Sequence, residues 1–271
     1  MKKDYTKKYH FKKDHLIWST LWPSLLYLGL SISISIIGVI IAAIFLTIKN
    51  MDINELTKSG TFILSLTLIT QILTIAICLP IFLYNREHYY PKPKSKPTFL
   101  FIILAILFFI CVTTPFNLLL SSINDNIDST TGVDIVNQIF ESAPLFLTII
   151  SGAILAPITE ELMLRGLTLN KLLSKKSALV SILITSILFG ILHFNIIQGL
   201  FAIIAGICLA YIYLKTKSLS VCIICHIVNN LIATIELYFT DKTNIIISII
   251  LFVIAIVPTY YFINKKEIDF E

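Results

Sequence analysis

Long apolar runs separated by short polar segments dominate this sequence. The first run, residues 16–48, is longer than the roughly 20 residues that cross a bilayer. Within it, Trp18, Trp22 and Pro23 predict an interfacial turn before a membrane span that begins near Ser24. The later apolar stretches are residues 61–84, 98–120, 144–176, 177–194, 196–214, 219–239 and 244–263. We therefore expect an all-α polytopic membrane protein, a bundle of about eight transmembrane helices.

The polar segments divide the chain into four parts. They are a basic tail at residues 1–15, three N-terminal transmembrane spans with their loops at 16–143, a core at 144–240, and a last span with its tail at 241–271. Basic residues alternate across the expected spans, and the side that is rich in lysine includes both ends of the chain. This pattern predicts that both termini are cytoplasmic. The acidic stretch 121–143 has no Lys or Arg and is expected on the opposite side.

The composition excludes a soluble globular domain. Of 271 residues, 56% are apolar and 14% are charged, and the mean hydropathy is +0.88. The net charge of +5 comes from basic residues between the spans, so we expect the lipid bilayer as a partner and no nucleic acid. All five cysteines lie in or beside apolar runs, which indicates reduced thiols. Cys222-x-x-Cys225-His226 matches a haem-attachment pattern, but its apolar helical context argues against haem.

The core stretch carries charges that an apolar span must accommodate. Glu160, Glu161 and Arg165 each cost several kcal/mol if they are left unpaired in hydrocarbon. Glu161 and Arg165 are four residues apart and share a helix face, whereas Glu160 points about 100° away. We expect a structural ion pair and one available carboxylate. The alternative is that all three form the polar cytoplasmic end of a span.

Three further polar side chains lie in later apolar runs: His193, His226 and Asn230. At about 1.5 Å per helical residue, these three and Glu160 fall in one layer, between about 13 and 25 Å from the cytoplasmic lysines. Pro157 is expected to disturb the helix that carries Glu160, because proline lacks a backbone N–H. The alternative is that each histidine is only an interhelical hydrogen bonder.

This set of groups is suited to hydrolysis by water. Glu160 and an imidazole could act as general bases, while a second imidazole and an amide donate hydrogen bonds to an oxyanion. The same carboxylate and two histidines could instead bind zinc, with water as the fourth ligand. The residues alone leave both chemistries open. Intramembrane Glu and His can also relay protons in a transporter, but no inverted repeat supports that function.

Three motifs in successive runs resemble those of the CPBP family of intramembrane proteases, which includes type II CAAX prenyl endopeptidases and the Abi and bacteriocin-immunity proteins. The motifs are Glu160-Glu161-x-x-x-Arg165, Phe189-x-x-x-His193 and His226-x-x-x-Asn230. The resemblance covers residues 144–238, and no motif position departs from the family pattern. It implies a helical bundle open to the cytoplasm, with Glu161 and Arg165 bracing the site.

The resemblance also implies individual catalytic roles. Glu160 and His193 would activate the hydrolytic water, and His226 with Asn230 would form the oxyanion pocket. The family has been described both as metalloproteases and as glutamate proteases, so the cofactor is either zinc, bound by Glu160, His193 and His226, or no metal at all.

The predicted function is an intramembrane endopeptidase that acts on a membrane-associated protein or peptide in a bacterial cell membrane. The preference for Lys over Arg favours a bacterial source and a peptide precursor over prenylated CaaX proteins. The alternative is a non-catalytic membrane scaffold or bacteriocin-immunity factor, in which the polar groups only hold the bundle together.

Overall fold

The computed structural model describes residues 15–49, 59–124, 138–237, 239 and 241–268, and the fold below refers to these residues. The larger helices are α1 (Leu16–Lys49), α3 (Gly60–His88), α4 (Phe99–Asn124), α9 (Ala178–Ile191), α10 (Ile196–Thr216), α11 (Leu219–Glu236) and α12 (Asp241–Asn264). The basic tail up to residue 14, the loop 50–58 and most of the acidic stretch, at 125–137, lie outside the described residues.

Within the described ranges, seven helices are long and apolar enough to cross a membrane, and α9 is a shorter apolar helix. The prediction of an all-α polytopic membrane protein is confirmed. The expected span 177–194 is corrected, because α9 has 14 residues and ends at Ile191. Phe194 has a φ of 51°, which no right-handed helix contains, and the side chain of Asn195 accepts the N–H of Gln198 as the N-cap of α10.

The predicted turn before Ser24 is wrong. Helix α1 begins at Leu16 and runs through Trp18, Trp22 and Pro23 without a break. A proline is tolerated inside a membrane helix where hydroxyl groups and neighbouring helices satisfy backbone carbonyls. In the turn before Pro23, the hydroxyl of Thr168 from a neighbouring helix donates to the carbonyl of Thr20 at 3.1 Å.

The fourth apolar stretch is a succession of short helices of two kinds. It comprises α6 (Leu145–Thr148), the π-helix η2 (Ile149–Leu155), α7 (Ala156–Glu161), the π-helix η3 (Leu162–Leu169) and α8 (Asn170–Leu173). The N–H of Ala156 bonds to the carbonyl of Ser151, five residues earlier, and Pro157 follows in the first turn of α7. The helix thus changes from π to α next to Pro157, where the sequence predicted a disturbance from the missing N–H of proline. Such wide turns are frequent at functional sites.

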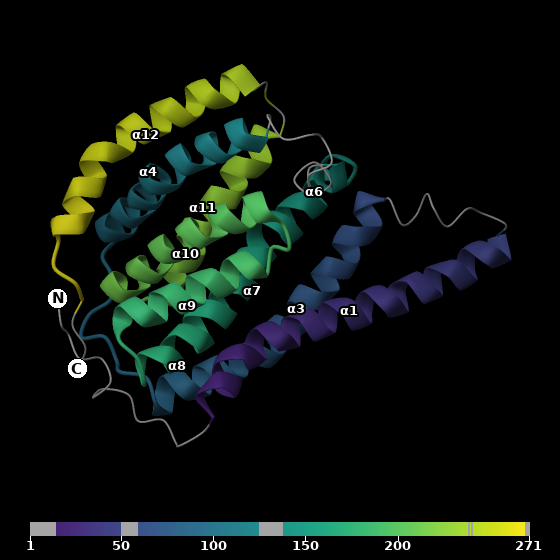
Figure 1. The fold of residues 1–271 in the computed structure, drawn as a ribbon, viewed down its shortest axis with the longest axis horizontal. Coiled ribbons are helices and arrows are strands. Elements are labelled where there is room, and N and C mark those ends of the chain that lie inside the picture. The colour runs from purple at the N-terminus through teal and green to yellow at the C-terminus, as the bar shows by residue number, and fades with distance from the viewer. Residues whose placement is uncertain (1–14, 50–58, 125–137, 238, 240, 269–271) are drawn as a thin grey trace.

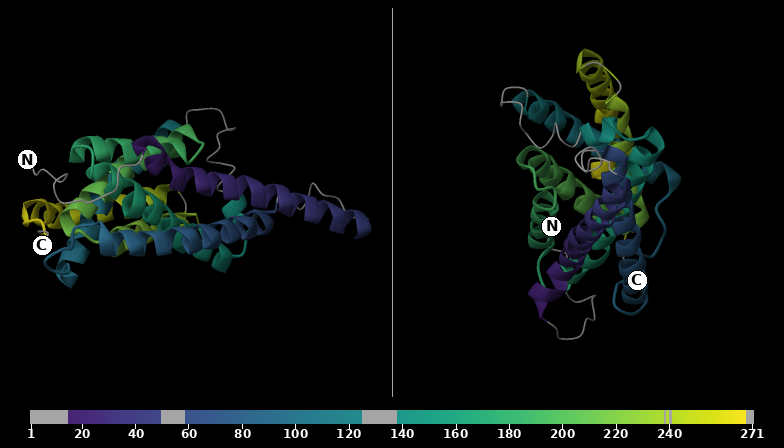
Figure 2. Two further views of the ribbon diagram at one scale, coloured as in Figure 1. Left: turned by 90° about the horizontal axis from the view of Figure 1, so that it is seen from below. Right: turned by 90° about the vertical axis from the view of Figure 1, so that its right-hand side faces the viewer.

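Helices α1, α3, α9, α10 and α11 contact the segment η2–α7–η3, while α4 and α12 pack against each other, with α4 also against α10 and α11. Helix α12 lies along α4, α9 lies along α10, and α1 lies along α3 and contacts η3, while α11 contacts η2 and α7 (Figure 1). Figure 2 shows that α1 extends beyond the other helices at one end. Helices α9 and α10 approach closely at Gly206, where a Cβ would lie 3.0 Å from the Cα of Ser186 on α9. This close approach brings η3, α9 and α10 together.

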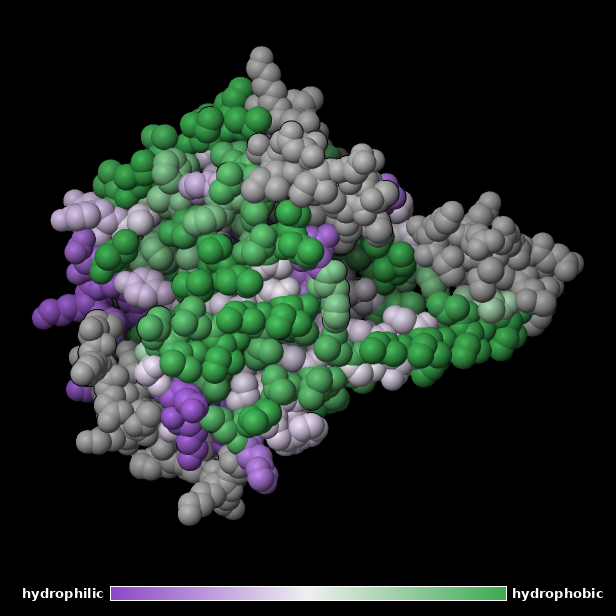
Figure 3. Space-filling model, viewed as in Figure 1, coloured by the Kyte–Doolittle hydropathy of each residue, from purple (hydrophilic) through white to green (hydrophobic). Residues whose placement is uncertain are grey.

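The surface of the bundle is apolar, as a lipid-facing surface must be. Figure 3 shows hydrophobic residues over most of the described part of this face, with hydrophilic residues gathered at the end where α8 and the C-terminal end of α12 lie. Large apolar side chains of α1, α9 and α12 are exposed, among them Ile32, Leu179 and Val257. The five cysteines are free thiols, four of them buried, as expected for small apolar side chains.

Candidate active site

Arg165 and Glu161 form the ion pair that their spacing predicted. Nη1 of Arg165 donates to Oε1 of Glu161 at 2.7 Å, and both side chains are fully buried. Nη2 donates to the backbone carbonyl of Gly206 on α10 at 2.9 Å. The guanidinium therefore joins η3 to α10 as well as neutralising a carboxylate. A planar fork suits these two acceptors better than the single ammonium of lysine.

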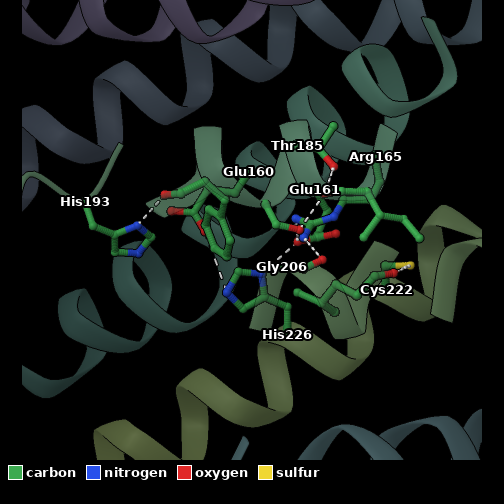
Figure 4. A network of polar contacts seen from close by, with 12 residues as sticks. Glu160, Glu161, Arg165, Thr185, His193, Gly206, Cys222 and His226 are labelled. Atoms are coloured by element: carbon green, nitrogen blue, oxygen red, sulfur yellow. Dashed lines mark hydrogen bonds and ion pairs between the residues drawn. The ribbon is translucent and has the colours of Figure 1, made fainter. Parts of the chain in front are cut away.

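His226 lies between the two glutamates of the motif (Figure 4). Its Nδ1 is 3.1 Å from Oε1 of Glu161, and its Nε2 is 3.7 Å from Oε2 of Glu160. The oxygen of Glu161 that faces the ring also accepts the hydrogen bond of Arg165, so we assign the ring hydrogen to Nδ1 as its donor. This contact fixes the orientation of the ring and leaves Nε2 directed at Glu160. The side chain of Glu160 is 21% exposed, so this carboxylate can be reached from outside the bundle.

His193 lies in the turn between α9 and α10 and not inside a helix. Its Nδ1 is 2.8 Å from the carbonyl oxygen of Phe189. A carbonyl oxygen only accepts, so Nδ1 donates, and in the neutral ring Nε2 keeps its lone pair. A Cβ at Gly190 would meet the carbonyl of Gly199 at 2.8 Å, so glycine is needed there to bring the two helices together at this turn. Both imidazoles lie within electrostatic range of the Glu160 carboxylate.

Phe189 is the aromatic centre of the site. Its ring is T-shaped to the ring of His193, with centroids 4.9 Å apart, and to the ring of His226, with centroids 5.6 Å apart. The guanidinium of Arg165 is 5.3 Å from the same centroid. The sequence placed Phe189 only at the first position of a motif and predicted no contact for it. Its spacing of four residues from His193 was the available signal.

Asn230 is tied to the segment that precedes Glu160. Its Nδ2 donates to the backbone carbonyl of Gly152 in η2 at 3.0 Å, and its Oδ1 accepts from Asn229 at 3.3 Å. The structure therefore brings Glu160 and His226 face to face, places His193 within electrostatic range, and directs the amide of Asn230 at η2. One N–H of that amide is not used by the bond to Gly152.

The predicted zinc ligands do not form a ligand set. In the part of the chain that the structure describes, no group of three His, Cys, Asp or Glu side chains could hold a metal ion. His226 directs one nitrogen to Glu161, and its other nitrogen is 3.7 Å from Glu160. The donor set Glu160, His193 and His226 therefore does not fit a three-ligand zinc site in this arrangement.

The part of the chain that carries this site is similar to known proteins. Residues 142–232 match the family model described as type II CAAX prenyl endopeptidase Rce1-like. This segment contains every residue of the three motifs and confirms the resemblance to CPBP family proteases.

The particular similarity is to a Bacillus subtilis (strain 168) protein described as "Putative membrane peptidase YdiL". The two chains are 31% identical over 93 residues, which is 34% of this chain and 37% of that relative. The aligned part thus spans little more than a third of the relative. No solved structure matches the chain. Both matches point to membrane proteases.

Proposed function

We propose that this protein is an intramembrane endopeptidase that hydrolyses a peptide bond in a membrane-associated protein or peptide. The observation that carries the proposal is the position of His226 between Glu160 and Glu161, with Nδ1 3.1 Å from Glu161 and Nε2 3.7 Å from the partly exposed carboxylate of Glu160. Such a fixed ring beside an available acid is the arrangement that general acid–base and oxyanion chemistry require. The match to a family of membrane proteases supports the same function.

In the proposed reaction, Glu160 takes a proton from the attacking water, while the Nε2 lone pair of His193 accepts a hydrogen bond from the second hydrogen of that water. The water oxygen then bonds to the scissile carbonyl carbon. The resulting oxyanion accepts hydrogen bonds from Nε2–H of His226 and from the second N–H of Asn230. In this role His226 is protonated on both nitrogens. The C–N bond breaks as Glu160 passes this proton to the leaving nitrogen, which gives an amine and a carboxylic acid. The acid then loses its proton to the solvent and becomes a carboxylate.

Arg165 and Glu161 hold this arrangement without contacting the substrate. Glu161 accepts hydrogen bonds from Arg165 and from His226 on the same oxygen, so it fixes the ring whose opposite nitrogen faces the reaction. Phe189 packs against both imidazoles and limits their rotation. Oriented groups of this kind contribute about 10²- to 10⁴-fold each to the rates of enzymes that use general acids and bases.

For the substrate, we propose an unprenylated peptide precursor that is anchored in a bacterial cell membrane and cleaved near the cytoplasmic leaflet. Lysine-rich loops and the bacterial relative support the source, and the positive-inside pattern supports cytoplasmic termini. The CAAX prenyl description of the family makes a prenylated peptide the alternative substrate.

The test is cleavage of defined peptides by purified protein in lipid vesicles. The probes are a fluorogenic peptide with an apolar transmembrane anchor and a farnesylated peptide with a CaaX terminus. We expect the wild type to cleave the first probe and Glu160→Gln to lose at least 100-fold in rate while it remains folded.

The matched control is Glu236→Gln, which changes a half-buried carboxylate at the end of α11 that bonds to Ser248. This variant should cleave at the wild-type rate. Cleavage of only the farnesylated probe would reject the proposed substrate class. Wild-type cleavage rates in Glu160→Gln would reject the proposed mechanism.

A further inference from the structure

Gln71 is a buried amide on α3 that bonds directly to the segment preceding Glu160. Its Nε2 donates to the backbone carbonyl of Ser151 at 3.2 Å, and its Oε1 accepts from the Ser151 hydroxyl at 3.2 Å. Gln71 is 1% exposed and Ser151 is fully buried. Gln71 lies outside the three motifs and outside residues 142–232, which the family model matches.

The Gly152 carbonyl in η2 has no backbone donor at either helical position, and the sequence explains why. The N–H of Ala156, which would serve Gly152 in an α-helix, reaches back to Ser151. The donor that would serve Gly152 in a π-helix is residue 157, a proline with no N–H. Asn230 fills this place by donating to the Gly152 carbonyl at 3.0 Å. Buried carbonyls need such partners.

Two side-chain amides thus bind two consecutive carbonyls, Gln71 at Ser151 and Asn230 at Gly152. They reach η2 from two different helices, α3 and α11. We call Gln71 and Asn230 the amide clamp. It joins the N-terminal spans and α11 to the wide turn that precedes Pro157.

We infer that Gln71 is a positioning residue for Glu160, because the amide clamp maintains the wide turn that sets the direction of α7. A π-turn takes up one residue more than an α-turn, and each residue advances a helix by about 100°. If η2 relaxed to a regular α-helix, α7 would turn by about this angle. Glu160 would then no longer face His226. This inference rests on the proposed function of Glu160.

The test compares Gln71→Met, which keeps the length of the side chain and removes both hydrogen bonds, with Thr74→Val. Thr74 is a fully buried residue on the same helix whose hydroxyl, among the residues that the structure describes, bonds to the carbonyl of Thr70 at 2.8 Å. With the anchored fluorogenic peptide, Gln71→Met should lower kcat at least tenfold and change KM less than twofold. Thr74→Val should stay within twofold of the wild type in both. The two variants should have similar thermal stability.

Ser151→Ala gives an independent check on the same contact. It removes the hydroxyl donor to Gln71 and should lower kcat by a smaller factor than Gln71→Met. The double variant should be no slower than Gln71→Met alone, because both changes act on one pair. The combination of Gln71→Met with Thr74→Val should show the product of the two single effects. If Gln71→Met fails to insert in the membrane, the same measurements compare Ser151→Ala with Thr74→Val.

A readout that does not depend on activity separates this inference from the proposed function. In histidine-labelled protein, the His226 signal, assigned with His226→Gln, should move in Gln71→Met and stay in place in Thr74→Val. Backbone hydrogen exchange in residues 149–161 should also rise only in the first variant. Identical spectra and kcat values in the two variants would overturn the inference. If Glu160→Gln left cleavage unchanged, the proposed function would be rejected. The His226 spectra and the hydrogen exchange of residues 149–161 would still test whether Gln71 positions this segment.

Discussion

Nδ1 of His226 lies 3.1 Å from Oε1 of Glu161, the same oxygen that accepts the hydrogen bond of Arg165. The buried ion pair is therefore not separate from the candidate catalytic groups, because one carboxylate oxygen serves both. A change at Glu161 or Arg165 should affect stability and the orientation of His226 together. Glu160, by contrast, is partly exposed and can be changed with little effect on the fold.

Arg165→Lys should destabilise the protein by about 2–3 kcal/mol. A lysine ammonium cannot bond to Glu161 and to Gly206 with the geometry of the guanidinium fork, and a buried carboxylate loses part of its pairing. Thermal unfolding in a mild detergent measures the effect. The control is Arg86→Lys, which replaces the other arginine of the sequence, in the last turn of α3. Equal unfolding temperatures in the two variants would contradict this prediction.

His193→Asn should remain folded and lose at least 100-fold in cleavage rate. The asparagine amide can replace the Nδ1 donor to the carbonyl of Phe189, but it offers nothing at the position of Nε2. The control is His88→Asn, because His88 makes the same contact to the carbonyl of Tyr84, at 2.8 Å on an exposed surface. Peptide cleavage and thermal unfolding of both variants check the prediction. An equal loss of rate in the control would contradict the prediction, because His88 lies outside the candidate site.

Phe189→Leu should lower kcat at least tenfold more than Phe109→Leu. Both phenylalanines are almost fully buried, so their stability losses should be similar, about 1 kcal/mol for the lost ring contacts. Only the Phe189 ring contacts His193, His226 and Arg165. The measurement is kcat with the anchored peptide, alongside thermal unfolding. Parallel losses of rate in both variants would indicate a general packing effect.

Cleavage should persist after treatment with a zinc chelator. The described side chains around Glu160 do not form a three-ligand set, and His226 is already engaged with Glu161. The test is elemental analysis of the purified protein and measurement of its cleavage rate before and after chelation. Stoichiometric zinc and a chelator-sensitive rate that zinc restores would contradict this prediction and support the zinc alternative.

Local spacing predicted some contacts of the candidate site well. The spacing of Glu161 and Arg165 by four residues was enough to predict their pairing, because a helix of either kind keeps such residues on one side. The long apolar runs predicted the membrane fold in the same way. These features depend on residues that are close together in the sequence, so the pattern of residue types is enough to predict them.

Contacts between distant segments were beyond the sequence patterns. Proline at 157 indicated a disturbed helix, but nothing in the order of residues specified two wide turns or the amides that hold one of them. The bond from Asn230 to Gly152 joins residues 78 positions apart and depends on how α11 packs against η2. The early end of α9 depends on the backbone of Phe194, whose φ of 51° the residue type disfavours.

The shortness of α9 has a consequence for the surrounding lipid. Its 14 residues extend about 21 Å at 1.5 Å per residue, whereas the hydrocarbon layer is about 30 Å thick. Either the bilayer is thinner beside this helix, or the turn that carries His193 lies below the level of the headgroups. A mismatch between helix length and bilayer thickness costs fractions of a kcal/mol per Å. A locally thin leaflet would shorten the distance that a peptide emerging from water travels to reach the imidazole.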